Sequence, residues 1–126
     1  MTFDTLALVT CVAACVLGIG WLAAGQLMLK RWRIEPSDGA LLVGRRIGVI
    51  YLGVALLFFL TRATSSPELI TIVSTFAVLA NALLAVLGLY EYRARRAGPA
   101  ILISVAVETL LAIGFGWLLL APGGSA

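Results

Sequence analysis

Residues 98–120 read GPAILISVAVETLLAIGFGWLLL, an apolar run that opens on Gly-Pro and carries one carboxylate, Glu108, near its middle. The run is long enough to cross a hydrocarbon core of about 30 Å as a helix that rises ~1.5 Å per residue. An ionisable side chain at such a depth costs roughly 2.5–3.5 kcal/mol on insertion scales, so it is normally retained for a reason. The segment therefore predicts a membrane-spanning helix with a structural or functional carboxylate inside it.

Three further apolar runs precede this one, so we expect the chain to cross the membrane four times. Of its 126 residues, 62% are hydrophobic and 12% are charged, whereas about a quarter of the residues of a soluble domain are charged. The sequence predicts an all-α, up-down four-helix bundle that forms a single transmembrane domain over residues 1–126. The expected spans cover about residues 5–29, 40–61, 68–90 and 99–120.

The second span contains two arginines, because its charge-free part is too short to cross a membrane. Residues 47–61 would cover roughly 22 Å as a helix, less than the ~30 Å core. Arg45 and Arg46 must therefore belong to the helix, and their side chains either reach the headgroups or turn inward to a carboxylate. One face of this helix forms a seam of small residues with one phenol in it, suited to close helix contact and made of Gly44, Gly48, Tyr51 and Ala55.

Basic residues gather around two of the three linkers. Eight of the nine Lys and Arg residues flank the linkers after the first and third spans, and Arg62 alone flanks the second linker. Basic linkers stay in the cytoplasm, so we expect both termini outside, in the periplasm if the protein lies in a bacterial inner (cell) membrane. These short clusters lack the extended basic stripe that nucleic-acid binding needs, so no nucleic-acid partner is expected.

The first span carries both cysteines of the chain. Cys11 and Cys15 have a C-x3-C spacing that is neither a redox motif nor a zinc pairing, so we expect two small core residues. An alternative interpretation takes residues 12–15, Val-Ala-Ala-Cys, as a lipobox, in which Cys15 would become a lipidated N-terminus. The absence of positive charge before the apolar run favours a retained helix, since a secretory signal begins with basic residues.

Metal and cofactor chemistry is not indicated. The chain has no histidine, which removes the commonest haem, zinc and copper ligand and the usual acid–base group near neutral pH. We therefore expect no cofactor, no metal ion and no catalytic residue, and we do not expect an enzyme.

Polar side chains from three spans are expected in one layer near the middle of the membrane. Glu108, Asn81 and Tyr51 each lie about 14–16 Å along their helices from the basic linkers, at a rise of ~1.5 Å per residue. Arg46 and Arg45 lie at a shallower depth, but the long stem of Arg46 could bring its guanidinium toward Glu108. These five residues are the candidates for a ligand or proton site.

Two interpretations of Glu108 remain open. In the first, Glu108, Tyr51 and Asn81 line an internal site for a proton, a cation or the polar head of a lipophilic small molecule. Burial disfavours the charged form of a carboxylate, so Glu108 would be largely neutral near pH 7 unless a cation compensates. In the second, Glu108 is paired with Arg46 or Arg45, is hydrogen-bonded to Tyr51 or Asn81 and only fixes helix register. Interhelical polar contacts of this kind contribute about 0.6 kcal/mol.

Two short motifs resemble small four-span bacterial membrane proteins of the DoxX-like group. They are Arg45-Arg46-Ile47-Gly48-x2-Tyr51-Leu52-Gly53 in the second span and Glu108-Thr-Leu-Leu-Ala-x-Gly in the fourth. The resemblance covers roughly residues 44–120 and implies an inner-membrane protein. Some members of that group are accessory subunits of membrane redox systems. The acidic first helix of small multidrug transporters has no counterpart here, which counts against drug export.

Two functional classes follow from these observations. The first is a non-enzymatic accessory or scaffold protein in the bilayer, whose small-residue seams pack against a partner membrane protein or a second copy of the chain. The alternative is a small transporter or a protein that binds a lipophilic small molecule, with a protonatable Glu108 at its centre.

Overall fold

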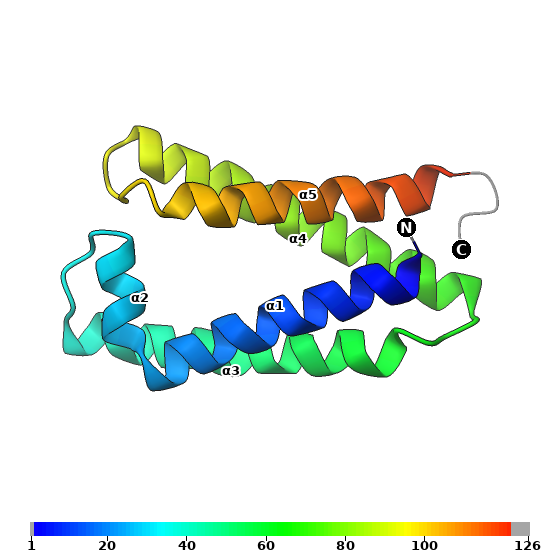
Figure 1. Ribbon diagram of the computed structural model, residues 1–126, viewed down its shortest axis with the longest axis horizontal. Coiled ribbons are helices and arrows are strands. Elements are labelled where there is room, and N and C mark those ends of the chain that lie inside the picture. Colours follow the sequence, from blue (N-terminus) through cyan, green and yellow to red (C-terminus); the bar gives the residue numbers. More distant parts are fainter. Residues whose placement is uncertain (1, 122–126) are drawn as a thin grey trace.

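The computed structural model describes residues 2–121, and this part of the chain consists of helices and linkers. The four long helices are apolar enough to cross a membrane and run up and down beside one another (Figure 1), so the predicted all-α four-helix architecture is confirmed. The elements in chain order are α1 (Phe3–Ala23), α2 (Gly25–Arg31), α3 (Asp38–Thr61), α4 (Pro67–Arg93) and α5 (Ile101–Leu120).

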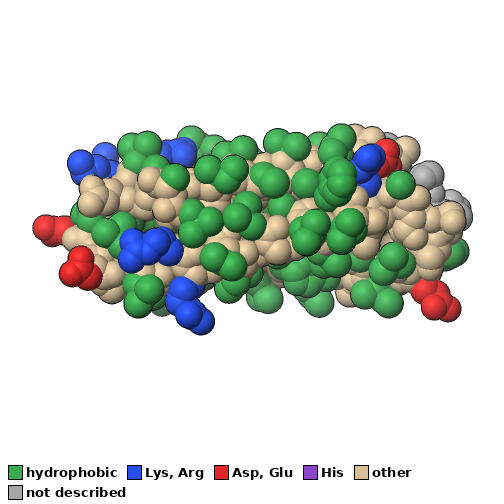
Figure 2. All heavy atoms as spheres, turned by 90° about the horizontal axis from the view of Figure 1, so that it is seen from below, with side chains coloured by type: hydrophobic (Ala, Val, Ile, Leu, Met, Phe, Trp, Pro, Cys, Tyr) green, Lys and Arg blue, Asp and Glu red, His purple; other side chains and the backbone are tan. Residues whose placement is uncertain are grey.

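The bundle has two distinct ends. We call the end that carries linkers 32–37 and 94–100 the basic end. We call the opposite end, where α1 begins and α5 stops, the terminal end (Figure 1). Between the two ends hydrophobic side chains cover much of the surface, and the charged side chains gather toward the ends (Figure 2). This distribution suits four helices that cross a bilayer along the long axis of the molecule.

The helices associate as two pairs. α1 packs along α3 and α4 packs along α5, while the pairs meet through smaller contacts of α1 with α5 and of α3 with α4. In the first pair the backbones of α1 and α3 are in contact at Gly18 and Gly48. A Cβ atom added to Gly48 would lie only 2.8 Å from the Gly18 carbonyl oxygen. The ring of Trp21 covers Gly44, whose added Cβ would lie 2.5 Å from that ring. The predicted small-residue seam of α3 therefore packs inside the chain, against α1.

The core shared by the two pairs lies in the half of the bundle nearer the terminal end. Phe58 of α3 and Phe115 of α5 are 1% and 0% exposed, and their ring centroids are 5.8 Å apart. Phe3 of α1 meets Phe115 edge-on at 6.3 Å. We call these three rings the aromatic cluster. The other core residues are Leu6, Ala7, Cys11, Ala14, Ala55, Ile70, Val73, Ala77, Leu111 and Leu118.

The prediction of one continuous first helix to residue 29 is wrong. α1 stops at Ala23, Ala24 has a non-helical backbone (φ −139, ψ 44), and α2 then turns across the basic end (Figure 1). The turn is possible because Gly20 leaves room for Met28, whose Sδ lies 3.2 Å from the position of an added Cβ. The Trp32 ring also packs edge-on against Trp21, with centroids 5.8 Å apart. α2 thus brings linker 32–37 close to linker 94–100.

The helix starts follow the capping residues in the sequence. Ser37 accepts a hydrogen bond from the Ala40 amide at 3.1 Å and starts α3. Ser66 accepts one from the Leu69 amide at 3.3 Å, and Pro67 is the first residue of α4. α5 begins at residue 101, slightly later than expected, after a tight turn that starts at residue 98.

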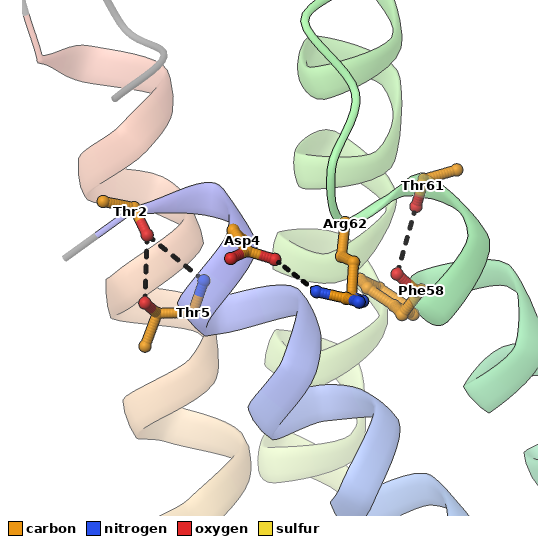
Figure 3. A network of polar contacts seen from close by, with 6 residues as sticks. All are labelled: Thr2, Asp4, Thr5, Phe58, Thr61 and Arg62. Carbon is orange, nitrogen blue, oxygen red and sulfur yellow. Dashed lines mark hydrogen bonds and ion pairs between the residues drawn. The ribbon is translucent and has the colours of Figure 1, made fainter.

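One ion pair joins the first pair of helices at the terminal end. The Arg62 guanidinium donates to the Asp4 carboxylate at 3.3 Å, linking the end of α3 to the first turn of α1 (Figure 3). The same guanidinium lies 5.0 Å from the centroid of the Phe59 ring. Both partners are partly exposed, so the pair adds little stability. It does neutralise Arg62, the one Lys or Arg that the described residues carry at this end.

Candidate functional site

Tyr51 and Glu108 face the interior of the bundle from two different helices. Tyr51 lies seven residues before Phe58 on α3, and Glu108 lies seven residues before Phe115 on α5. Residues seven apart share a helix face, and the two phenylalanine rings meet at the bundle centre. Tyr51 is half-buried and packs against the core. Glu108 is half-buried and lies within electrostatic reach of Tyr51.

Asn81 of α4 lies in the same layer. It follows Ala77, a core residue that is 1% exposed, by one helical turn toward the basic end. Its amide nitrogen donates to the Ala77 carbonyl at 2.8 Å. Its carbonyl oxygen has no hydrogen-bond partner within the part of the chain that the structure describes. We call Glu108, Tyr51 and Asn81 the polar layer, which lies just beyond the shared core.

Arg45 and Arg46 belong to α3, as predicted, but they do not join the polar layer. Both side chains are exposed, and the ion pairs formed within residues 2–121 are Asp4–Arg62 and Glu91–Arg96. The reason is rotation about the helix axis. Arg46 precedes Tyr51 by five residues, which is about 140° around a helix with 3.6 residues per turn. The pairing of Arg46 or Arg45 with Glu108 is therefore absent from this structure.

The cysteines lie on the inner face of α1. Cys11 is buried in the core, Cys15 is half-buried against it, and both are unbonded thiols, which confirms the expectation of small core residues. Within residues 2–121 no three His, Cys, Asp or Glu side chains come together in a way that could hold a metal ion.

The polar layer offers a defined set of chemical groups. Glu108 can accept hydrogen bonds or bind a cation, the Tyr51 hydroxyl can donate or accept, and the Asn81 carbonyl can accept. This set suits the polar head of a molecule that donates hydrogen bonds, such as an ammonium or a hydroxyl group. The sequence identified these three residues from their matched depths, but it did not show that Arg45 and Arg46 point away from them.

The fold and the polar layer together define a small multi-pass membrane protein. Comparison of the chain with protein-family models, curated proteins and solved structures finds no match. The resemblance to the DoxX-like group therefore stays a prediction that rests on the two motifs of α3 and α5.

Proposed function

We propose that this membrane protein is not an enzyme and that it binds a lipophilic small molecule with an amine or hydroxyl head at the polar layer. The observation that carries the proposal is the position of Glu108. The half-buried carboxylate lies on the face of α5 that meets the core and forms no ion pair within residues 2–121. A carboxylate at this depth is costly unless a partner compensates for it, and the head of a bound ligand would be that partner.

We propose that the ligand enters between the two helix pairs. The shared core fills the half of the bundle toward the terminal end, and the polar layer begins where that core stops. A lipophilic molecule could place its head at Glu108 and its chain between the pairs, toward the basic end. The aromatic cluster of Phe3, Phe58 and Phe115 fills the bundle on the other side of the polar layer, toward the terminal end. Binding is therefore proposed in preference to transport.

Chemical labelling of Glu108 tests this proposal. Dicyclohexylcarbodiimide partitions into apolar regions and modifies protonated carboxyl groups, so we expect it to label Glu108 of the protein in mild detergent. Dodecylamine, used as the probe ligand, should protect the residue, and intact-mass analysis would measure both effects. The Glu108→Gln variant should lose the labelling and most of the dodecylamine binding, because the amide cannot pair with an ammonium group.

The stability of the same variant separates binding from a structural ion pair. Because no cation pairs with Glu108, we expect Glu108→Gln to unfold at nearly the same denaturant concentration as the parent protein. A loss of several kcal/mol, as expected when one partner of a buried pair is removed, would contradict the proposal. Glu68→Gln is the matched control, since Glu68 is exposed in the first turn of α4 and should change neither property.

The proposed membrane is the inner membrane of a bacterium, with the basic end in the cytoplasm and both termini in the periplasm. In a Cys11→Ala/Cys15→Ala background, we expect Ser65→Cys to react in intact cells with a thiol reagent that cannot cross membranes. Ser37→Cys should react only after the cells are opened. Both serines are exposed, at opposite ends of the bundle. Labelling in the reverse order would overturn this orientation.

A second candidate function is that of an accessory subunit, which the exposed arginines of α3 favour. Arg45 and Arg46 form no ion pair within residues 2–121, and a carboxylate on a partner helix would compensate for them. We expect a partner that co-purifies in mild detergent to be lost from the Arg45→Gln/Arg46→Gln variant. It should be retained by Lys30→Gln/Arg31→Gln, which removes the same charge from α2. Retention by both variants would argue against this contact.

A further inference from the structure

Linkers 32–37 and 94–100 belong to different helix pairs but lie at the same end of the bundle (Figure 1). The Gly98 amide of linker 94–100 donates to the Trp32 carbonyl of linker 32–37 at 2.7 Å. Gly98 is buried, and a Cβ atom there would lie 2.8 Å from Cγ and 2.9 Å from Cδ of Arg33. The stem of Arg33 therefore lies across Gly98 and contacts linker 94–100.

A cavity of about 530 Å³ lies where the linkers meet, and four arginines line it: Arg33, Arg93, Arg95 and Arg96. Glu91 neutralises one of them, because its carboxylate accepts hydrogen bonds from Arg96 at 2.6 Å and 3.1 Å. The other three guanidinium groups form no ion pair within residues 2–121. The cavity therefore carries an excess of positive charge drawn from both helix pairs.

Two of these arginines occupy backbone positions that favour glycine. Arg33 and Arg95 have φ values of 59 and 62, and each directly follows the C-cap residue of its helix. The hydrogen bonds of a Schellman motif surround both positions, from the Ile34 amide to the Leu29 carbonyl and from the Arg96 amide to the Glu91 carbonyl. Glycine is the usual residue there. Arginine in this strained conformation indicates a use for its side chain.

We propose that this cavity binds the phosphate of an anionic phospholipid headgroup. Guanidinium groups bind phosphate oxygens through paired, charge-assisted hydrogen bonds. The cavity lies at the ends of the apolar spans, where lipid headgroups are found, and Tyr92 on its wall is a residue typical of that interface. A phosphate held by Arg33 and by Arg93 or Arg95 would tie the α1–α3 pair to the α4–α5 pair.

Glycine substitutions test the site without risk to the fold. The Arg33→Gly/Arg95→Gly variant removes two guanidinium groups and relieves both strained positions, so we expect it to be at least as stable as the parent protein. Its affinity for phosphatidylglycerol, measured by native mass spectrometry in a zwitterionic detergent, should fall roughly 10- to 30-fold, since each basic residue near a lipid surface contributes ~1 kcal/mol. If the variant binds the lipid as tightly as the parent does, the proposal is wrong.

Charge-matched variants separate a specific site from the general potential of the basic end. Arg33→Gln/Arg95→Gln should weaken lipid binding about as much as the glycine double variant. Arg31→Gln/Arg46→Gln removes the same charge from exposed residues that do not line the cavity, and should change affinity no more than about threefold. Equal losses in the two glutamine variants would refute a discrete site.

A competition experiment distinguishes a lipid headgroup from a soluble phosphate compound. Inorganic phosphate at millimolar concentration should displace phosphatidylglycerol only weakly, because it lacks the acyl chains that keep the lipid at this depth. Tighter binding of inorganic phosphate than of phosphatidylglycerol would overturn the assignment to a lipid.

Discussion

Replacement of Phe58 by alanine is expected to lower the free energy of unfolding by about 3 kcal/mol, at the lower end of the range for buried aromatic side chains. The ring is 1% exposed and contacts both Phe115 and Phe76, with centroids 5.8 Å and 6.4 Å away. Its removal leaves a hole where α3 meets α4 and α5. The lower end of the range applies because the lipid is also apolar, so the loss is one of packing contacts.

The adjacent residue supplies the control for this experiment. Phe59 is 48% exposed on the outer face of α3. In Phe59→Ala, lipid fills the space of the ring, so few contacts within the protein are lost. We expect it to cost less than about 1 kcal/mol, chiefly through the lost contact with Arg62. Unfolding of both variants from mild detergent by added dodecyl sulfate would measure the difference. Equal losses would show that the aromatic cluster does not join the two helix pairs.

The second large effect is expected for Gly48→Ala, which should destabilise the protein by about 2 kcal/mol, as overpacked cores typically do. A Cβ atom on Gly48 would lie 2.8 Å from the Gly18 carbonyl oxygen. That oxygen is part of a helix backbone and cannot rotate away, so α1 and α3 must move apart. The same unfolding assay would measure the loss.

Gly53→Ala is the matched control on the same helix. Nothing lies within 4 Å of a Cβ atom at this position, and the residue is exposed. Alanine favours the helix over glycine by roughly 0.5–1 kcal/mol, so Gly53→Ala should stabilise the protein slightly. Opposite signs for the two substitutions would demonstrate backbone contact between α1 and α3. A loss in both would indicate a general intolerance of α3 to side chains.

Much of the fold could be predicted because membrane insertion imposes simple rules on a sequence. The apolar run of residues 98–120 and three others gave the number of spanning helices, since only a helix of that length satisfies its backbone in lipid. The third span was expected from about residue 68, and α4 begins at Pro67, directly after its capping residue Ser66. The seam of Gly44, Gly48 and Ala55 gave the packing face of α3, although not the helix it would meet.

The errors have physical causes that a single helix does not reveal. The chain turns at Ala24 because Met28 and Trp32 pack back onto α1, and those contacts appear only when the helix has turned. The depth of Arg46 along α3 would allow its side chain to reach Glu108. Its position around the helix axis instead places the side chain on the outer face. The contact of Arg33 with Gly98 depends on the turn after α2 and on the turn after α4, which lie far apart in the sequence.

The contact between the linkers also determines where the two helix pairs can separate. At the terminal end, separation would uncover Phe3, Phe58 and Phe115 and would have to overcome their packing. At the basic end, the backbone bond from Gly98 to Trp32 is the hydrogen bond that joins the pairs within residues 2–121, and a single such bond contributes only about 0.5–1.5 kcal/mol. The two helix pairs are therefore held firmly at the aromatic cluster and only weakly at the basic end. If the pairs move apart around Glu108, the hydrogen bond from Gly98 to Trp32 is expected to break first.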